Sequence, residues 1–402
     1  MLITHPSIDY PAVMTNACES RRIHVLVLTP LYPCQGDEAD GCFIADSIEC
    51  LSKSNIEFTT IAVKPWSRSS YKTSDLVPAA IWARFPYVPT RAGWAGWGLS
   101  IYARVAPFVR RLHRRKKIDL IHAHCAVPCG HPAAILARQL GVPFIVTSHG
   151  LDVFCKSLNG FPGRWCEHYS RFVYERANLN ICVSEGVRSA LLKGLVSART
   201  AVVYNGVDTD LFAPPEPGPK PAAQTILSVG RLVPDKGQEV VLRAVAALIE
   251  KYPSLQYTNI DDGPDRRRLA GLSRELNIAN RVTFLGRKTR VEVSEAMKRC
   301  TLFALPSRNE ALGCVYLEAM ATGKVVIACR GQGISDVIHH GENGWLIGPD
   351  NVPEMIQALS TLLDNATLRE RIGHQARTTI IDGLTLGQQA QLLNKAYRDC
   401  LV

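Results

Sequence analysis

The chain has 402 residues, of which 47% are hydrophobic, and a formal net charge of +10. That length exceeds what one ordinary hydrophobic core organises, so we expect two domains, and the excess of positive charge favours an anionic partner. No apolar stretch approaches the roughly 20 residues that cross a bilayer. We expect residues 1–22 to be a loose N-terminal extension without the apolar segment of a secretory signal. The 13 scattered cysteines favour reduced thiols in a cytoplasmic protein.

The first half of the chain alternates short apolar runs with helical patterns, which is typical of a parallel β/α domain. Residues 23–29 (IHVLVLT) form the first predicted strand. The loop at 30–42 contains Gly41, and a residue without a side chain lets the backbone come close to a ligand. The alternative is that Gly41 serves only a flexible turn. Further strands are predicted at 58–63, 119–125, 178–183 and within 142–153.

A strongly basic amphipathic helix is predicted at residues 101–117. Seven arginines and lysines surround its apolar face, which consists of Ile101, Val105, Phe108, Val109 and Leu112. With tryptophans just before it, such a helix is typical of one that lies on an anionic membrane surface. The alternative is an ordinary helix whose apolar stripe packs on the sheet. Because the cations come without a recognisable nucleic-acid-reading module, we expect no nucleic acid as partner.

A cluster of metal-ligand residue types follows on the next predicted strand. His122 and His124 stand near Cys125, Cys129 and His131, a composition that suggests zinc. A strand, however, directs His122 and His124 to one face and the cysteines elsewhere, whereas zinc needs ligands that converge in a tetrahedron. We therefore expect no metal site here.

His149 stands at the carboxyl end of the strand predicted within 142–153. Open parallel α/β sheets bind their ligands at that end, so His149 is a candidate site residue. The alternative is a histidine that is hydrogen-bonded within its own loop.

A proline-rich segment, residues 213–223 (APPEPGPKPAA), separates the two halves of the chain. Its five prolines make it a stiff spacer. We therefore predict a first domain at 23–212 and a second domain at 224–402.

The second domain opens with TILSVGRLVPDKG, in which a predicted strand at 225–229 is followed by Gly230. Arg231 and Lys236 then stand in a glycine-bounded loop. A guanidinium fork and an ammonium point charge in such a loop suit a diphosphate. The alternative is that both are ordinary surface cations.

Residues 301–330 (TLFALPSRNEALGCVYLEAMATGKVVIACR) predict a strand, a loop, a helix and a second strand. Glu310 stands where the loop enters the helix, and Glu318 lies inside the helix. Backbone N–H groups at the start of this helix offer a phosphate site. These groups belong to Ala311, Leu312 and Gly313. The alternative is a capping box formed by Ser307 and Glu310, which needs no ligand.

Together these motifs resemble glycosyltransferase family 4, whose members are retaining enzymes of the GT-B fold. The resemblance runs from residue 23 to the C-terminus and is carried by residues 142–152, 230–237 and 306–328. It implies two doubly wound, Rossmann-like β/α domains that face each other across a cleft, with a last helix that crosses back to the first domain. It further implies transfer of a hexose from a nucleoside diphosphate sugar to a saccharide or lipid-linked acceptor. Such a reaction would belong to polysaccharide or cell-envelope glycan synthesis and would need no metal or other cofactor.

The same resemblance implies roles for the candidate residues of the second domain. Glu310 would hold the donor sugar, and Glu318 would hold the ribose hydroxyls of the nucleotide. Arg231 and Lys236 would bind the departing diphosphate. From the first domain, His149 would contact the transferred sugar, and the loop of Gly41 would lie beside the diphosphate.

Two positions depart from the family pattern. Asp261 stands where the family usually has a glycine, near the expected nucleotide, so it could shift donor preference, weaken donor binding or mark an inactive relative. Gln332 and Asp336 replace the first glycine and the glutamate of the usual Gly-Gly-x-x-Glu, whose second glycine is Gly333. Two alternative functions therefore stay open, a same-fold sugar-nucleotide epimerase and a catalytically degenerate protein that binds a glycan or a partner.

Overall fold

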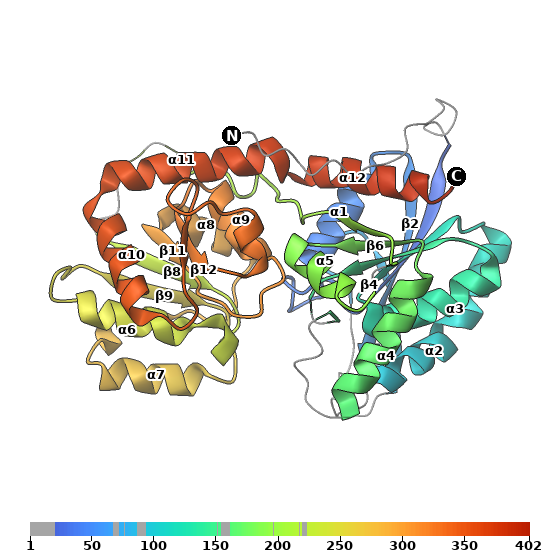
Figure 1. Cartoon of the computed structure of the whole chain (residues 1–402), viewed down its shortest axis with the longest axis horizontal. Coiled ribbons are helices and arrows are strands. Elements are labelled where there is room, and N and C mark those ends of the chain that lie inside the picture. The colour runs from blue at the N-terminus through green and yellow to red at the C-terminus, as the bar shows by residue number, and fades with distance from the viewer. Residues whose placement is uncertain are drawn as a thin grey trace. The chain divides into compact units, whose positions relative to one another are not determined.

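The computed structural model describes residues 21–66, 72–75, 77–86, 94–150, 152–153, 161–195, 197–216, 218 and 223–402 of the chain. It divides into two compact units (Figure 1). The first unit comprises residues up to Tyr204 together with Gln389–Val402, and the second unit comprises Asn205–Gln388. Apart from Arg21 and Arg22, the predicted N-terminal extension lies outside the described residues.

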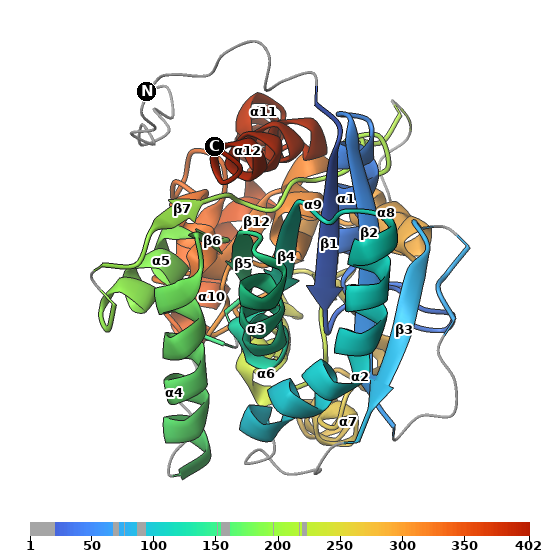
Figure 2. The ribbon, with the colours of Figure 1, turned by 90° about the vertical axis from the view of Figure 1, so that its right-hand side faces the viewer.

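The described part of the first unit contains a seven-stranded parallel sheet in the order β3-β2-β1-β4-β5-β6-β7. Its strands are β1 Ile23–Thr29, β2 Ile56–Pro65, β3 Ala80–Phe85, β4 Leu120–His124, β5 Phe144–Ser148, β6 Leu179–Cys182 and β7 Thr200–Val202. Its helices are α1 Cys42–Ser52, α2 Trp94–Arg115, α3 His131–Leu140, α4 Phe161–Arg176 and α5 Glu185–Leu192. Figure 2 shows α2, α3 and α4 in front of this sheet.

The strand order explains where a ligand would lie in the first unit. Every residue of β1 is buried, as expected for a central parallel strand covered on both faces. The chain leaves β1 toward β2 on one side and later returns to β4 on the other side, so the order reverses between β1 and β4. In doubly wound sheets, ligands bind at the carboxyl ends of strands beside such a reversal. Gly41, His124 and His149 all follow or end strands at that edge.

Helix α2 differs from the predicted basic helix at 101–117. It begins at Trp94 and runs through Pro107 to Arg115. Ile101, Val105 and Val109 are buried, as expected for the alternative in which the apolar stripe packs inside the protein, whereas Phe108 is 41% exposed. Ala106 is buried as well, so Phe108 lies at the edge of the buried stripe.

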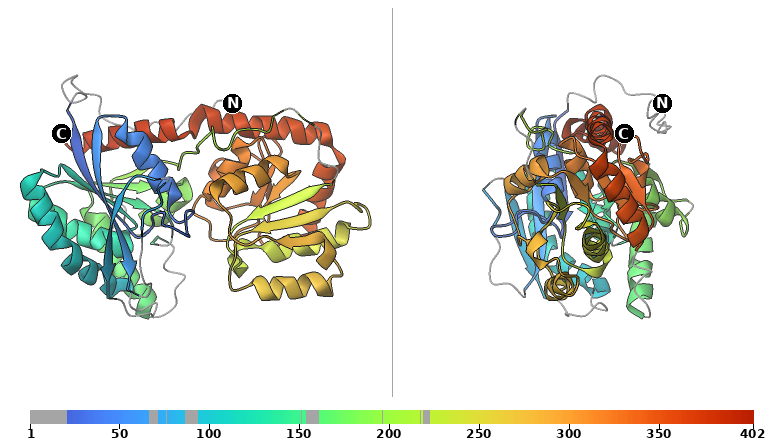
Figure 3. Two further views of the ribbon diagram at one scale, coloured as in Figure 1. Left: turned by 180° about the vertical axis from the view of Figure 1, so that it is seen from behind. Right: turned by 90° about the vertical axis from the view of Figure 1, so that its left-hand side faces the viewer.

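The second unit contains, in its described residues, a six-stranded parallel sheet in the order β10-β9-β8-β11-β12-β13. Its strands are β8 Thr225–Val229, β9 Gln256–Ile260, β10 Val282–Phe284, β11 Leu302–Ala304, β12 Val326–Cys329 and β13 Trp345–Ile347. Its helices are α6 Gln238–Leu248, α7 Arg266–Glu275, α8 Arg290–Arg299, α9 Cys314–Ala321, α10 Val352–Asp364 and α11 Ala366–Gly383. The left part of Figure 3 shows the strands of this sheet from behind, in yellow and orange.

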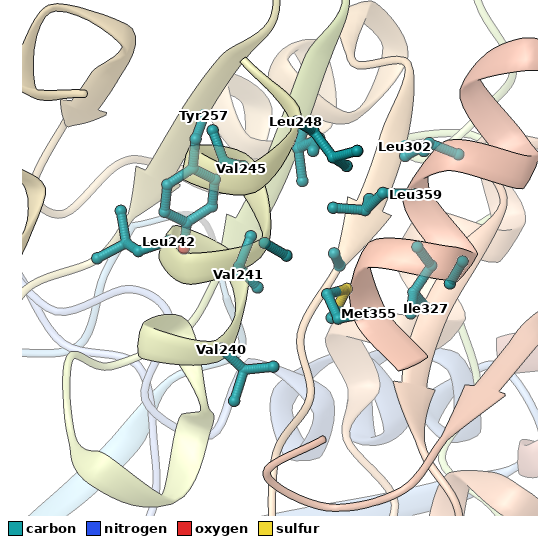
Figure 4. Close-up of a cluster of buried hydrophobic side chains, with 14 of the residues drawn as sticks. Val240, Val241, Leu242, Val245, Leu248, Tyr257, Leu302, Ile327, Met355 and Leu359 are labelled. Carbon is teal, nitrogen blue, oxygen red and sulfur yellow. The ribbon is translucent and has the colours of Figure 1, made fainter. Parts of the chain in front are cut away.

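A dense apolar core holds the second sheet in place. Helices α6 and α10 pack together over the strands, and Figure 4 shows their side chains meeting those of the sheet. The contributing residues include Val241, Val245, Leu248, Leu302, Ile327, Met355 and Leu359. Because each of these seven is at most 5% exposed, the carboxyl ends of β8 and β11 emerge from a rigid base.

The boundary between the units differs from the predicted linker at 213–223, part of which lies outside the described residues. The second unit begins upstream, at Asn205. Val207 donates a backbone hydrogen bond to Leu384 at 2.9 Å, and Phe212 is 1% exposed. These contacts tie the segment before the prolines to the second unit. The last helix, α12 Leu386–Asp399, contains the other boundary, since residues from Gln389 onward group with the first unit.

Candidate functional site

In the second unit, two loops meet at the carboxyl ends of β8 and β11, where the strand order reverses. The loop after β8 contains Arg231 and Lys236. Gln238, which is 2% exposed, donates hydrogen bonds to the carbonyl oxygens of Gly230 at 3.3 Å and Arg231 at 3.1 Å. The buried Gln238 side chain thus fixes the backbone of this loop, whereas the Arg231 side chain is exposed.

Lys236 and Glu310 contact each other directly. The Lys236 Nζ donates a hydrogen bond to the Glu310 Oε2, and the two side chains are only 27% and 17% exposed. The structure therefore unites a cation and an acid that were predicted separately, for a diphosphate and for a sugar. The pairing itself was not predicted, because it depends on β8 and β11 being neighbours.

The backbone of Glu310 is held by the segment after β12. Its N–H donates to the Gln332 Oε1 at 3.0 Å, and its carbonyl accepts from the Gly333 N–H at 3.0 Å. Gln332 was noted only as a departure from the family pattern. Its contact gives that departure a structural role, the anchoring of the Glu310 loop.

Helix α9 begins at Cys314, with Gly313 as its N-cap residue. Gly313 has a φ of 82°, and a Cβ on it would lie 2.5 Å from the Tyr316 ring, so the position requires glycine. Because the helix begins beyond Glu310, the alternative of a capping box formed by Ser307 and Glu310 is wrong.

The side chains of Ala311 and Leu312 are buried, at 8% and 1% exposure. These two residues can therefore offer a ligand only their backbone groups. Glu318 lies about 6 Å further along the α9 axis than Cys314, at roughly 1.5 Å per residue. It is half-buried, and its carbonyl accepts from the Thr322 N–H at 3.1 Å.

The loop after β9 carries Asp261 next to the Arg231 loop. Gly230 donates a backbone hydrogen bond to Ile260 at 3.0 Å, and Leu232 donates one to Asp262 at 3.1 Å, so the two loops are joined. Asp261 has a φ of 99°, in a region that favours glycine. Its Oδ1 accepts a hydrogen bond from the Asp262 N–H at 2.7 Å. The backbone here has a conformation that favours glycine, although the residue is an aspartate.

In the first unit, Gly41 is the N-cap of α1, with a φ of 76°. A Cβ there would lie 2.5 Å from the backbone of Leu31, so this glycine is a structural requirement and more than a flexible turn. Because Gly41 packs directly on the backbone of Leu31, α1 begins at a position where the Phe43 ring lies 5.0 Å from the His149 ring.

His149 follows β5 and contacts the last residue of β4. Its Nε2 lies 3.0 Å from the Nδ1 of His124. His122 lies two residues earlier on the same face of β4, and its ring centroid is 4.4 Å from that of His124. The two nitrogens of His122 each lie 2.7 Å from a hydroxyl group, that of Tyr397 and that of Thr147. The prediction that His122 and His124 lie on the same face of the strand was correct. The sequence did not predict the hydrogen bond between His124 and His149.

Burial keeps these three imidazoles neutral at pH 7. It lowers the pKa of His122 to about 3 and that of His149 to about 4, and it holds the pKa of His124 well below its usual value. Burial also raises the pKa of the Cys125 and Cys129 thiols well above the ordinary value, so both stay protonated. Among the described residues, no group of three or more histidines, cysteines or carboxylates is arranged to hold a metal ion.

Asp152 joins the loops that carry the histidines. It is 4% exposed, and its Oδ2 accepts a hydrogen bond from the Ala126 N–H at 2.7 Å. Since Ala126 follows β4 and Asp152 follows β5, this contact fixes one loop against the other.

Two family models match adjoining parts of the chain. The model for Glycosyltransferase Family 4 matches residues 14–211, and the model for Glycosyl transferases group 1 matches residues 212–379. An uncharacterized glycosyltransferase of Methanocaldococcus jannaschii is 29% identical over 280 residues, which cover 70% of this chain and 75% of that protein.

Solved structures share the fold across nearly the whole chain. Sucrose-phosphate synthase from Thermosynechococcus elongatus is 20% identical with a TM-score of 0.77, and the match covers 94% of this chain and 98% of that chain. HepE from Anabaena, in complex with UDP-glucose, is 20% identical with a TM-score of 0.71, and the match covers 93% and 99%. With its two parallel Rossmann-like sheets, the chain therefore belongs to glycosyltransferase family 4 and has the GT-B fold.

Proposed function

We propose that this glycosyltransferase moves a hexose from a nucleoside diphosphate sugar to a hydroxyl of a saccharide or lipid-linked acceptor, with retention of the anomeric configuration. The observation that carries the proposal is the Lys236–Glu310 contact at the reversal point of the second sheet. It places a cation for a diphosphate beside a carboxylate for sugar hydroxyls. The complex of HepE with UDP-glucose supports a donor of this class.

The leaving diphosphate accumulates negative charge as its bond to the sugar breaks. Arg231 and Lys236 offset that charge, together with the backbone N–H groups at the start of α9. These groups belong to the segment Ala311–Gly313. With two cations assigned to this task, we expect transfer to continue when divalent metals are chelated.

The sugar and the nucleoside are held by other residues. Glu310 binds hydroxyls of the sugar, His149 contacts the sugar from the first unit, and Glu318 binds the ribose. The acceptor oxygen bonds to the anomeric carbon on the face from which the diphosphate departs. The proton of the acceptor hydroxyl passes to a diphosphate oxygen, so Glu310 does not act as a covalent nucleophile.

We further propose that α2 brings the enzyme to an anionic membrane surface, on the inner face of the cell membrane, where lipid-linked acceptors and envelope glycans are assembled. Phe108 is 41% exposed. Exposed Arg104 and Arg111 stand four residues before it and three residues after it, on the same side of the helix. Apolar side chains among cations are the composition of a helix that lies in a lipid interface. Among the described residues, no helix has both the length and the apolar character of a membrane span.

A panel of nucleotide sugars tests the proposal in two steps. Thermal stabilisation should identify the nucleoside diphosphate and its sugar, and incubation with acceptors should then yield a product whose anomeric configuration is read by NMR. Conversion of the donor without an acceptor would support the epimerase. Stabilisation by a glycan alone, with no turnover of any nucleotide sugar, would support the binding protein, and either outcome would overturn the proposal.

A further inference from the structure

The ends of β4 and β5 place two imidazoles against each other. His124 is the last residue of β4 and pairs in register with Thr147 of β5, two residues before His149. The His124 Nδ1 and the His149 Nε2 are 3.0 Å apart. The ring planes are only 18° apart, and the centroids are separated by 5.2 Å. This distance between two nitrogens is that of a hydrogen bond.

One hydrogen bond between two neutral imidazoles leaves only two arrangements of protons. A neutral imidazole carries one proton, and its other nitrogen is an acceptor. If the His124 Nδ1 carries the bridging proton, the His149 Nε2 is bare and His149 carries its own proton on Nδ1. If the His149 Nε2 carries the bridging proton, the His149 Nδ1 is bare and His124 carries its proton on Nε2. In both arrangements the two rings have the same tautomer.

Neighbouring rings prevent the pair from turning apart. The Phe43 ring lies 5.0 Å from His149, and the His122 ring lies 4.4 Å from His124. His122 is itself fixed by the hydroxyl groups of Tyr397 and Thr147. In the described part of the chain, the protein makes its hydrogen bond to His149 through Nε2 alone. The Nδ1 of His149 is therefore the atom left to meet a ligand.

We propose that His124 is a positioning residue that couples its own tautomer to that of His149: with the proton on the His124 Nδ1 the His149 Nδ1 donates to a substrate hydroxyl, and with the proton on the His124 Nε2 it accepts from one. This inference rests on the proposed function, in which His149 contacts the transferred sugar. In either arrangement the coupled pair presents one kind of hydrogen-bonding partner to the sugar. His124 acts through His149 and does not itself contact the substrate.

NMR of protein labelled with ¹⁵N at histidine tests the tautomers without any substrate. At pH 7.5, two-bond ¹⁵N–¹H couplings should give His124 and His149 the same tautomer, with the signals assigned from the His124→Phe and His149→Phe variants. In His124→Phe, the signals of His149 should move toward those of a mixture of tautomers. Opposite tautomers in the wild type, or an unchanged His149 in His124→Phe, would overturn the inference.

Kinetics with the transferred sugar provide the second test. Losing the hydrogen-bond partner in His124→Phe should lower kcat by about five- to a hundredfold, with the Kd for the nucleoside diphosphate that stabilises the protein unchanged within about twofold. His124→Asn places an amide near the position of Nδ1 and should recover most of the loss. His168→Phe, an exposed histidine on α4, is the matched control and should behave as the wild type.

The two tests separate the inference from the proposed function. If the wild type transfers sugar and His124→Phe keeps its kcat, or if His124→Asn is as impaired as His124→Phe, the positioning role is wrong and the function stands. If the wild type turns over no nucleotide sugar, the proposed function is wrong, and the NMR result still decides whether the two tautomers are coupled.

Discussion

The ammonium group of Lys236 is paired with the carboxylate of Glu310, a residue 74 positions away in the sequence. Both side chains lie in the loops at the point where the second sheet reverses its strand order, and both are largely shielded from water. A diphosphate at this edge would compete with Glu310 for Lys236. Donor binding would then free the carboxylate for the hydroxyls of the sugar, so that one contact serves both halves of the donor.

Lys236→Ala should impair turnover more than binding. A cation that meets charge developing in the transition state contributes mainly to kcat, and loss of one such group typically costs about 100- to 1,000-fold. We expect a drop of that size in kcat and a rise of about tenfold or less in the donor Kd, measured by steady-state kinetics and calorimetry. Lys251→Ala removes an exposed lysine paired with Asp364 at 2.7 Å and is the matched control. Equal losses in kcat and binding would contradict the assigned role.

Glu318→Ala should weaken nucleotide binding. Loss of one buried hydrogen-bonding partner costs about 1–3 kcal/mol, which is about five- to a hundredfold in Kd. Calorimetry with the nucleoside diphosphate that stabilises the protein, and with its 2′,3′-dideoxy form, makes the test specific for the ribose. The wild type should lose affinity for the dideoxy form, whereas Glu318→Ala should bind both forms equally. If the variant still prefers the ribose form, Glu318 does not hold these hydroxyls.

Binding to anionic vesicles should depend on the exposed face of α2. Each basic residue near such a surface contributes about 1 kcal/mol, so the double variant Arg104→Glu, Arg111→Glu should bind at least thirtyfold more weakly in a flotation assay. The control is the double variant Arg267→Glu, Arg299→Glu, which changes the net charge equally on exposed helices of the second unit. A similar loss in both variants would point to net charge alone and would remove α2 as the binding surface.

The strands could be predicted closely because central parallel strands are continuous apolar runs. The predicted ranges 23–29 and 225–229 coincide with β1 and β8. Strand β3 (Ala80–Phe85) was missed, because it lies at the sheet edge, contains alanines and an arginine and is largely half-exposed. The residues of the individual motifs, such as Lys236 and Glu310, could also be predicted as candidate site residues. The contact between them depends on which strands are neighbours in the sheet, and spacing along the chain does not determine that order.

The stability of the first unit should fall as the pH falls below about 6.5. His122 is 2% exposed, and burial lowers its pKa to about 3. Its unfolded pKa is about 6.5, so below that pH the unfolded chain binds a proton that the folded chain does not bind. His122 thus contributes its full stability above pH 6.5 and loses about 1.4 kcal/mol per pH unit down to about pH 3. The test is the free energy of unfolding, measured in urea between pH 7.5 and 5. Below pH 6.5 it should fall less steeply in His122→Gln than in the wild type, by about 1.4 kcal/mol per pH unit. An unchanged slope would show that His122 protonates equally in both states.

Asp261→Gly should stabilise the second unit. A non-glycine residue at a φ of 99° carries strain of about 1–3 kcal/mol, whereas a new glycine costs about 0.4–1 kcal/mol through the entropy of the unfolded chain. The lost contact with Arg287, at 3.9 Å and largely exposed, contributes little. We therefore expect a gain of about 1 kcal/mol in the free energy of unfolding, while Asp261→Ala, which keeps a Cβ, should show no gain. Donor affinity in Asp261→Gly then distinguishes the roles of the aspartate, because tighter binding means that Asp261 hinders the nucleotide and weaker binding means that it contacts the nucleotide. Loss of stability in Asp261→Gly would show that the hydrogen bond from the Asp262 N–H outweighs the backbone strain.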